Sequence, residues 1–358
     1  MTAVRTIPVR GGMESLAWDG DDLVDLVGGG RRWAPDGTER DTSVRWGFPF
    51  DRAALSPSGR YAAVWAERGT KGLVVEVERP AVVREVNRSY YHSMDYDYPL
   101  ALGRLPDGRE VLVHCPEHHN ELQVEDLVTG ERLTAGPRGP ADVFHSRPEV
   151  SPDGRHLLAV GWVWAPIGVA ALHDLTAALA DPAALDTDTL FAPHAGADAE
   201  VGAACWLDAQ RLAVATGEET LGPDGDEGLG PLHLGVWSVP ERRWLHRSPL
   251  ERPTGTLLAR GEQVLALYGH PRLLDAATGA VLAEWPEAGL PEKDLCYGVT
   301  HVPSPIAALS PDGTRLAVAR PDAVAVIDLP PIPDRPAPAP APAPTPPSPG
   351  ARSVRAVL

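Results

Sequence analysis

The stretch RSYYHSMDYDYP, residues 88–99, contains four of the seven tyrosines in the 358-residue chain. The four are Tyr90, Tyr91, Tyr96 and Tyr98, and His92, Asp95 and Asp97 stand among them. A tyrosine side chain buries a large area while its hydroxyl keeps a hydrogen bond, so tyrosines gathered in a loop are typical of protein contact surfaces. The stretch is therefore our first candidate for a functional site.

Two further segments concentrate aromatic residues. WGFPF, residues 46–50, supplies Trp46, Phe48 and Phe50, and GWVWAPIG, residues 161–168, supplies Trp162 and Trp164. Both segments lie between apolar runs, where loops are expected. We predict that these residues join the tyrosine stretch in binding a partner.

Two polar segments invite a metal interpretation. HCPEHHNE, residues 114–121, contains three histidines, a cysteine and two glutamates, but His114 and Cys115 point to opposite sides of a strand and no second ligand pair has zinc spacing. DGDEG, residues 224–228, resembles a calcium loop, yet Gly228 occupies a ligand position and no glutamate closes the frame. We interpret both as solvated loops and expect neither a metal nor a cofactor.

The sequence contains no catalytic signature of the serine-hydrolase elbow, zinc-protease, P-loop or dinucleotide-binding type. An active site assembled from separate segments would leave no such motif, and four loop histidines with Asp95 and Asp97 are available for one. These histidines are His92, His145, His194 and His301. A lyase, a hydrolase or a small-molecule sensor thus remains the alternative to a binding protein.

The composition excludes several classes of function. The formal net charge of −17 argues against nucleic acid and against anionic membranes, because both require a basic surface. Three widely spaced cysteines form no disulfide framework. The sequence has neither the apolar core of a signal peptide nor an apolar run that spans a bilayer, so we expect a cytoplasmic protein.

The chain repeats one unit. ALSPSGRYAAV (54–64), RLPDGREVLV (104–113), EVSPDGRHLLAV (149–160) and ALSPDGTRLAVA (308–319) are clear copies, and weaker ones begin near residues 16, 205 and 257. Proline and aspartate favour the turn, and glycine accepts a positive φ, so each unit reads as a hairpin of two short strands. A further apolar run follows most hairpins, which indicates sheets of three or four strands repeated seven times.

The SPDG units resemble the WD40-type β-propeller family in its bacterial form, over roughly residues 13–329. The Trp-Asp dipeptide of that family is replaced by pairs such as Glu125-Asp126 and Ile327-Asp328. The resemblance implies an all-β, seven-bladed propeller of four-stranded blades. We expect the strand AVRTIPV (3–9) to pair with VAVIDL (324–329) and close the ring.

The resemblance also implies that the connections between blades and the loops between second and third strands share one face. The tyrosine stretch and the other aromatic loops would then surround one mouth of the ring. We predict an interaction scaffold that binds a protein partner with basic patches through this face. The alternative is that these rings only plug the mouth and pack between blades.

Two segments depart from the repeat. Residues 330–349 contain eleven prolines, mostly alternating with alanine, and we predict that residues 330–358 form a disordered tail with polyproline II character, outside the propeller domain of residues 1–329. LHDLTAALADPAALDTDTLF, residues 172–191, is rich in alanine and leucine, which favours a short inserted helix on the rim.

Overall fold

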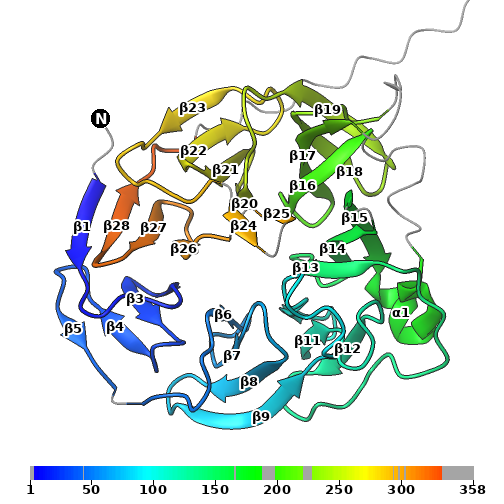
Figure 1. Ribbon diagram of the computed structural model, residues 1–358, viewed down its shortest axis with the longest axis horizontal. Coiled ribbons are helices and arrows are strands. Elements are labelled where there is room, and N and C mark those ends of the chain that lie inside the picture. The colour runs from blue at the N-terminus through cyan, green and yellow to red at the C-terminus, as the bar shows by residue number, and fades with distance from the viewer. Residues whose placement is uncertain are drawn as a thin grey trace, which may run out of the picture.

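The computed structural model describes residues 4–42, 44–164, 167–187, 198–220, 228–292, 294–296, 299–301 and 304–332. Seven antiparallel sheets of these residues stand as blades around a common axis (Figure 1). The prediction of an all-β, seven-bladed propeller is confirmed. Within the described ranges no helix has the length and apolar character needed to cross a membrane.

Five blades have four strands each. Blade one contains β2 (Ala17–Asp19), β3 (Asp22–Asp25), β4 (Arg31–Trp33) and β5 (Glu39–Arg40), and blade two contains β6 (Arg52–Leu55), β7 (Tyr61–Trp65), β8 (Lys71–Glu76) and β9 (Ala81–Asn87). Blade five contains β16 (Ala199–Trp206), β17 (Arg211–Thr220), β18 (His233–Ser238) and β19 (Arg243–Pro249). Blade six contains β20 (Thr256–Arg260), β21 (Gln263–Tyr268), β22 (His270–Asp275) and β23 (Val281–Glu284).

Blade seven closes the ring, because both ends of the propeller contribute to it. It contains β26 (Ala307–Leu309), β27 (Arg315–Arg320) and β28 (Ala323–Asp328), with β1 (Val4–Pro8) as the outer strand. Strand β1 pairs antiparallel with β28 from Val4 opposite Ile327 to Pro8 opposite Ala323. The predicted closure by the N-terminal strand is thus present. A separate hairpin, β24 (Asp294–Cys296) and β25 (Val299–His301), precedes this blade, and His301 ends β25.

Blades three and four each have three regular strands. Blade three contains β10 (Ala101–Arg104), β11 (Glu110–His114) and β12 (Gln123–Asp126), and blade four contains β13 (Phe144–Val150), β14 (His156–Val163) and β15 (Ile167–Asp174). In blade three, Leu133 N donates to Val124 O at 2.8 Å, so the chain after β12 runs briefly along the edge of that strand. In blade four, helix α1 (Leu175–Ala180) and the 3₁₀ turn Pro182–Leu185 lie on the outer rim (Figure 1), where we predicted an insertion.

The SPDG turns have the geometry that their residues favour. Gly59, Gly154 and Gly313 have φ of 70°, 72° and 69°, a left-handed conformation that glycine adopts without strain. In the last repeat, hydrogen bonds from Ser310 and Thr314 lower the pKa of Asp312 to about 2. These turns are therefore stabilised by residues within each hairpin.

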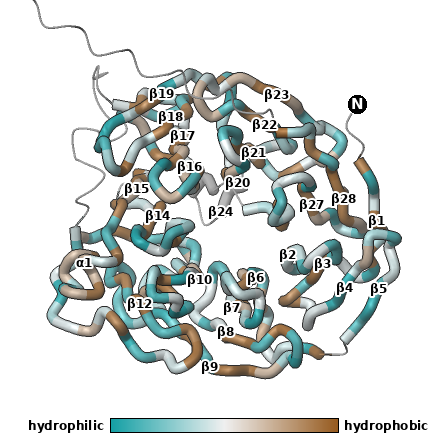
Figure 2. The backbone as a smooth tube through the Cα atoms, turned by 180° about the vertical axis from the view of Figure 1, so that it is seen from behind, coloured by the Kyte–Doolittle hydropathy of each residue, from teal (hydrophilic) through white to brown (hydrophobic). Residues whose placement is uncertain are grey.

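The core lies between adjacent blades. Phe50, Val24 and Val64 pack together between blades one and two, and Leu158, Leu212 and Trp237 between blades four and five. Hydrophobic positions recur along the strands around the whole ring, for example in β28 (Figure 2). Each blade therefore depends on its neighbours for burial of its apolar side chains.

The strand register defines two faces. In blade two, Arg52 pairs with Trp65, Trp65 with Gly72, and Lys71 with Asn87, so the start of β6, the loop between β7 and β8 and the end of β9 share one edge. We call this side the loop face. The opposite side carries the SPDG turns, and we call it the turn face. The connection from β9 to β10, which holds the tyrosine stretch, begins on the loop face.

Candidate functional site

The connection from β9 to β10 is organised by one buried arginine. Arg88 directly follows β9 and is 4% exposed. Its guanidinium donates hydrogen bonds of 2.7 to 3.2 Å to five backbone carbonyl oxygens, those of Glu67, Gly69, Ser93, Tyr96 and Asp97. One side chain thus satisfies backbone acceptors from two loops and holds the tyrosine stretch in a single conformation.

Two of the four tyrosines pack against this arginine. The Cζ atom of Arg88 lies 4.4 Å from the ring centroid of Tyr96 and 5.0 Å from that of Tyr98, within range of a cation–π contact. Both tyrosines are 2% exposed, and burial raises the pKa of Tyr96 to about 12. We expected both tyrosines on a contact surface. This prediction is wrong for Tyr96 and Tyr98, because their rings are buried against the guanidinium of Arg88.

Tyr98 also begins a buried chain of polar contacts. Its hydroxyl lies 3.2 Å from His114 Nδ1, and His114 Nε2 lies 3.3 Å from Glu125 Oε1. Arg84 Nη1 donates to Glu125 Oε2 at 2.9 Å. Burial acts to raise the pKa of Glu125, but the bonds from His114 and Arg84 outweigh it and hold that pKa below its usual value. The chain joins blades two and three, and it places His114 in a structural position.

The other half of the stretch is exposed. Tyr90 is 80% exposed, Tyr91 49% and Met94 46%. Between them His92 has φ of 50°, which is uncommon for a residue other than glycine, and its Nδ1 donates to Asp95 Oδ2 at 2.6 Å. The turn therefore leaves Tyr91 and His92 accessible to solvent, while the buried Arg88 binds the backbone of the turn.

Tyr91 and His92 belong to a larger group of rings, which we call the aromatic patch. Its members are Tyr91, His92, His119, Phe144, Trp162 and Trp164. Phe144 is fully buried at its centre and stacks on Trp162, with a centroid distance of 4.1 Å and an interplanar angle of 10°. Trp164 meets Phe144 edge-on at 5.2 Å and remains 50% exposed.

The patch combines residues from blades three and four with residues from the connection between blades two and three. His92 lies 4.5 Å from Tyr91 and 5.2 Å from Trp164, both measured between ring centroids and both edge-on. Tyr91 and Trp164 are therefore two exposed rings that both contact one imidazole. Edge-on and offset pairs are the favoured aromatic arrangements, so the exposed rings are fixed by their neighbours.

The sequence alone did not reveal Phe144 and His119 as members of the patch. Phe144 opens β13, and His119 stands in the segment HCPEHHNE, which we interpreted as a solvated loop. His119 Nε2 instead donates to Asp142 Oδ1 at 2.7 Å, and its ring lies 4.4 Å from that of Phe144. One signal was available, since Phe144 is one of only four phenylalanines and directly precedes a predicted inner strand.

The segment WGFPF forms a separate group between blades one and two. Trp46 Nε1 donates to Leu26 O at 3.0 Å, and Phe50 is 5% exposed, so we correct the expected contact role of Phe50. Phe48 is 41% exposed, with its centroid 5.3 Å from that of Phe50. Among the described residues no ring contact joins this group to the aromatic patch.

Asp97, which we considered for an active site, is held by two arginines. Arg68 lies 3.2 Å from Asp97 Oδ1, and Arg147 Nε donates to Oδ2 at 3.0 Å. Nearby, burial and the negative charge of Asp97 raise the pKa of Glu67, which Arg52 Nε bonds at 2.8 Å. These ion pairs link blades two and four through the connection from β9 to β10.

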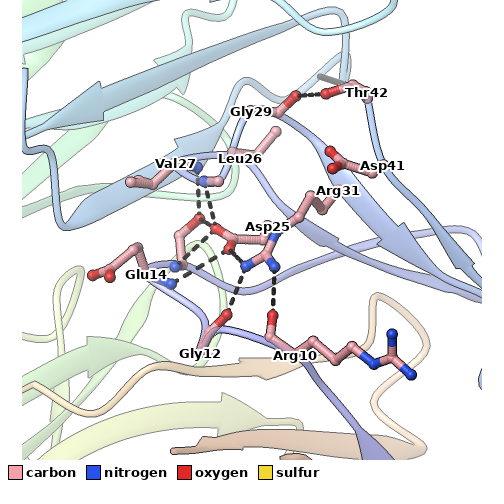
Figure 3. A network of polar contacts seen from close by, with 12 residues as sticks. Arg10, Gly12, Glu14, Asp25, Leu26, Val27, Gly29, Arg31, Asp41 and Thr42 are labelled. Carbon is pink, nitrogen blue, oxygen red and sulfur yellow. Dashed lines mark hydrogen bonds and ion pairs between the residues drawn. The ribbon is translucent and has the colours of Figure 1, made fainter. Parts of the chain in front are cut away.

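A comparable network stabilises blade one (Figure 3). Asp25 is fully buried and accepts hydrogen bonds from Ser15 Oγ at 2.9 Å, Gly28 N at 2.9 Å and Arg31 Nη2 at 3.1 Å. Arg31 also donates to the carbonyl oxygens of Arg10 and Gly12. The carboxylate of Asp25 thus joins the loop before β2, which holds Ser15, to the loop after β3, which holds Gly28. We therefore assign this network a structural role.

Of the remaining candidate histidines, His145 is the one whose side chain the structure describes. His145 is 4% exposed and lies 6.3 Å from His173 between ring centroids, and burial lowers the pKa of His145 to about 3 and that of His173 to about 4. His194 and the side chain of His301 lie outside the described residues. Within the described part of the chain, no group of three or more histidine, cysteine, aspartate or glutamate side chains is placed to hold a metal ion.

Comparisons with known proteins identify the fold. No protein-family model matches the chain, and no curated protein matches it either. Among solved structures, a chain of the "Crystal Structure of Mitotic Checkpoint Complex" is 13% identical, with a TM-score of 0.58 and coverage of 91% of each chain. A chain of "Kuenenia stuttgartiensis Hydrazine Synthase" is 17% identical, with a TM-score of 0.57 and coverage of 90% of this chain and 96% of that one. At these identities the likeness establishes the β-propeller fold and nothing finer.

Proposed function

We propose that this propeller is a protein-interaction module whose loop face binds a partner protein through the aromatic patch. The observation that carries the proposal is the exposure of two rings, Tyr91 at 49% and Trp164 at 50%, which stand on a support of buried aromatic side chains. Rigid, exposed aromatic rings lose little conformational entropy on binding and are enriched at the centres of interfaces.

The surroundings of these rings favour a partner with basic patches. Asp95 and Asp142 border the patch with side-chain exposures of 40% and 62%, and each accepts a hydrogen bond from a histidine of the patch. The net charge of −17 adds a long-range attraction for basic surfaces. We infer that an aromatic centre with an acidic border sets the specificity of the site.

The repeats support a place for the chain among WD40-like proteins of the SPDG type. The turns at Gly59, Gly154 and Gly313 share one conformation, and each follows an inner strand of its blade. The buried polar networks around Asp25 and around His114 stand where loops leave the strands, but they use different residues from blade to blade. We infer that the buried polar networks of this chain differ from blade to blade and do not repeat around the ring.

The test is affinity capture from a native lysate with the tagged full chain. The double variant Tyr91→Ala/Trp164→Ala should recover the bound partner at least about tenfold less well, because aromatic anchors at interface centres contribute well over 1 kcal/mol. The matched control is Phe48→Ala, which removes an exposed ring of the same face from another pair of blades.

Circular dichroism should show the same fold for both variants, since exposed substitutions change stability little. Equal recovery of every captured protein by the double variant and by the unaltered chain would contradict the proposal. Loss of a partner from Phe48→Ala alone would move the interaction surface to the WGFPF group.

A further inference from the structure

We propose that the aromatic patch of one molecule binds the proline-rich segment 333–358 of a second copy of the same chain. The proposal rests on the proposed function of the patch as a docking surface, and it names an occupant for that surface. Four features of the molecule lead to it: the composition of the segment, the spacing of the exposed rings, the opposite charges of the two parts, and the face from which the segment leaves the propeller.

The segment has the composition that aromatic surfaces recognise. Residues 330–349 contain eleven prolines, and the part PAPAPAPAP, residues 336–344, alternates proline with alanine. Such sequences favour polyproline II, which loses little entropy on binding and packs its proline rings against tyrosine and tryptophan faces. The patch offers exposed rings of both types, Tyr91 and Trp164.

The spacing of these rings suits that helix. The centroids of Tyr91 and Trp164 lie 4.5 and 5.2 Å from that of His92, so the two exposed rings are at most about 10 Å apart. One turn of polyproline II advances about 9 Å, three residues of about 3.1 Å each. Both rings therefore lie within about one turn of such a helix, so one short stretch of it can contact both.

The charges of the two parts are opposite. Residues 333–358 contain Arg335, Arg352, Arg355 and the single acidic residue Asp334, so this segment carries +2 and the remaining 332 residues carry −19 of the total −17. Asp95 and Asp142, which border the patch, keep side-chain exposures of 40% and 62%. The arginines of the segment would meet these carboxylates.

The exit of the segment points to a second copy. The carbonyl oxygen of Pro330 accepts a hydrogen bond from Arg260 Nη2, and Arg260 Nε donates to Gly313 O in the turn of blade seven. The chain therefore leaves the propeller on the turn face beside blades six and seven, whereas the patch lies on the loop face at blades three and four. In a head-to-tail contact, the segment of one copy reaches the patch of the next copy directly. Within a single molecule the segment would have to pass around the propeller from the turn face to the loop face.

The experiment uses the full chain with Ser348→Cys labelled by an oxazine dye, which tryptophan quenches on contact. Cys115 and Cys205 are buried, and Cys296→Ser removes the third thiol. Fluorescence should fall as the concentration of the protein rises, and unlabelled full chain should produce the same decrease. Trp164→Ala in the unlabelled partner should weaken the association about tenfold, equivalent to about 1.4 kcal/mol, whereas Phe48→Ala should leave it unchanged.

Three outcomes would overturn the proposal. Fluorescence that does not change with concentration or with Trp164→Ala would show that the segment does not use the patch. Quenching that depends on Trp164 but not on concentration would place the segment on its own molecule. Association that Trp164→Ala leaves intact would place the contact elsewhere. Because purified protein is used, none of these outcomes decides whether the patch binds a different protein, which the capture experiment tests.

Discussion

The guanidinium of Arg88 lies over the ring of Tyr96, with Cζ 4.4 Å from the ring centroid, and its Nη2 also donates to the carbonyl oxygen of the same residue at 3.0 Å. The side chain and the backbone of Tyr96 thus both contact the guanidinium of Arg88. The position of the exposed Tyr91 follows from this contact, since the backbone of the turn that carries it is held from both ends.

Replacing Arg88 should unfold the turn and destabilise blade two. Arg88→Ala removes the guanidinium donor from five carbonyl oxygens, of which that of Glu67 keeps the bond from Tyr98 N, so we expect the free energy of unfolding to fall by about 3 kcal/mol or more. Urea denaturation measures the change. Arg79→Ala, at an exposed position of the same blade, is the control and should stay within about 0.5 kcal/mol of the unaltered chain. A loss for Arg88→Ala as small as that of the control would mean that the carbonyl oxygens find other donors.

Phe144 and Trp164 should respond differently to truncation although their rings touch. Phe144→Ala leaves a cavity at the centre of the patch, with an expected cost of about 3 to 5 kcal/mol. Trp164→Ala removes a half-exposed ring and should cost about 1 kcal/mol or less. Denaturant midpoints of the two variants give the comparison. Equal costs would show that the exposed ring is part of the core and not a contact ready for a partner.

Acid should destabilise the propeller through two buried histidines. The pKa values of His145 and His173 are lowered by burial to about 3 and about 4, while an unfolded chain titrates near 6.5. Between these values the unfolded state binds more protons, so stability is full above about pH 6.5 and falls as the pH drops toward 4, by about 1.4 kcal/mol per pH unit for each histidine.

Unfolding free energies measured between pH 7 and 4 test this expectation. The double variant His145→Gln/His173→Gln should show a shallower dependence on pH, whatever its stability at neutral pH. His246, which is exposed on β19, offers His246→Gln as a control that should leave the slope unchanged. An unaltered slope in the double variant would assign the acid sensitivity to other groups.

Two glycines with the same turn conformation should differ in their tolerance of alanine. A Cβ at Gly154 would overlap the carbonyl oxygen of Arg104 in the neighbouring blade, whereas a Cβ at Gly59 meets no atom within 4 Å. Both substitutions carry the strain of a positive φ, about 1 kcal/mol. Gly154→Ala should cost clearly more, because backbone must also move. Thermal unfolding compares the two variants, and equal shifts would mean that blades three and four separate easily at this point.

The propeller could be predicted because its evidence is local. Proline, aspartate and glycine in the SPDG units determine the turn, and the apolar residues beside them determine the strands. Seven similar hairpins can therefore be predicted without knowledge of any distant contact. The closure by β1 was also predictable, since the last repeat lacked an outer strand. The short outer edge of blade three was not, because its pairing rests on only a few backbone bonds.

The aromatic patch could be predicted only in part. Tyr91, His92, Trp162 and Trp164 were expected on one surface, and the structure brings them together. Tyr96 and Tyr98 lie in the same loop as the exposed Tyr91, yet they are buried because they pack against Arg88. Which tyrosines face solvent depends on the path of the backbone around that guanidinium, and Phe144 enters through the stacking of blade four on blade three. Neither is encoded in the spacing of residues along the chain.

The pairing of β1 with β28 also has a consequence for biosynthesis. The two strands are more than 300 positions apart, so a chain leaving the ribosome exposes the free edge of β1 until Ala323–Asp328 has emerged. The two strands that close the ring are far apart in the sequence, so they can pair only after the blades between them have been synthesised.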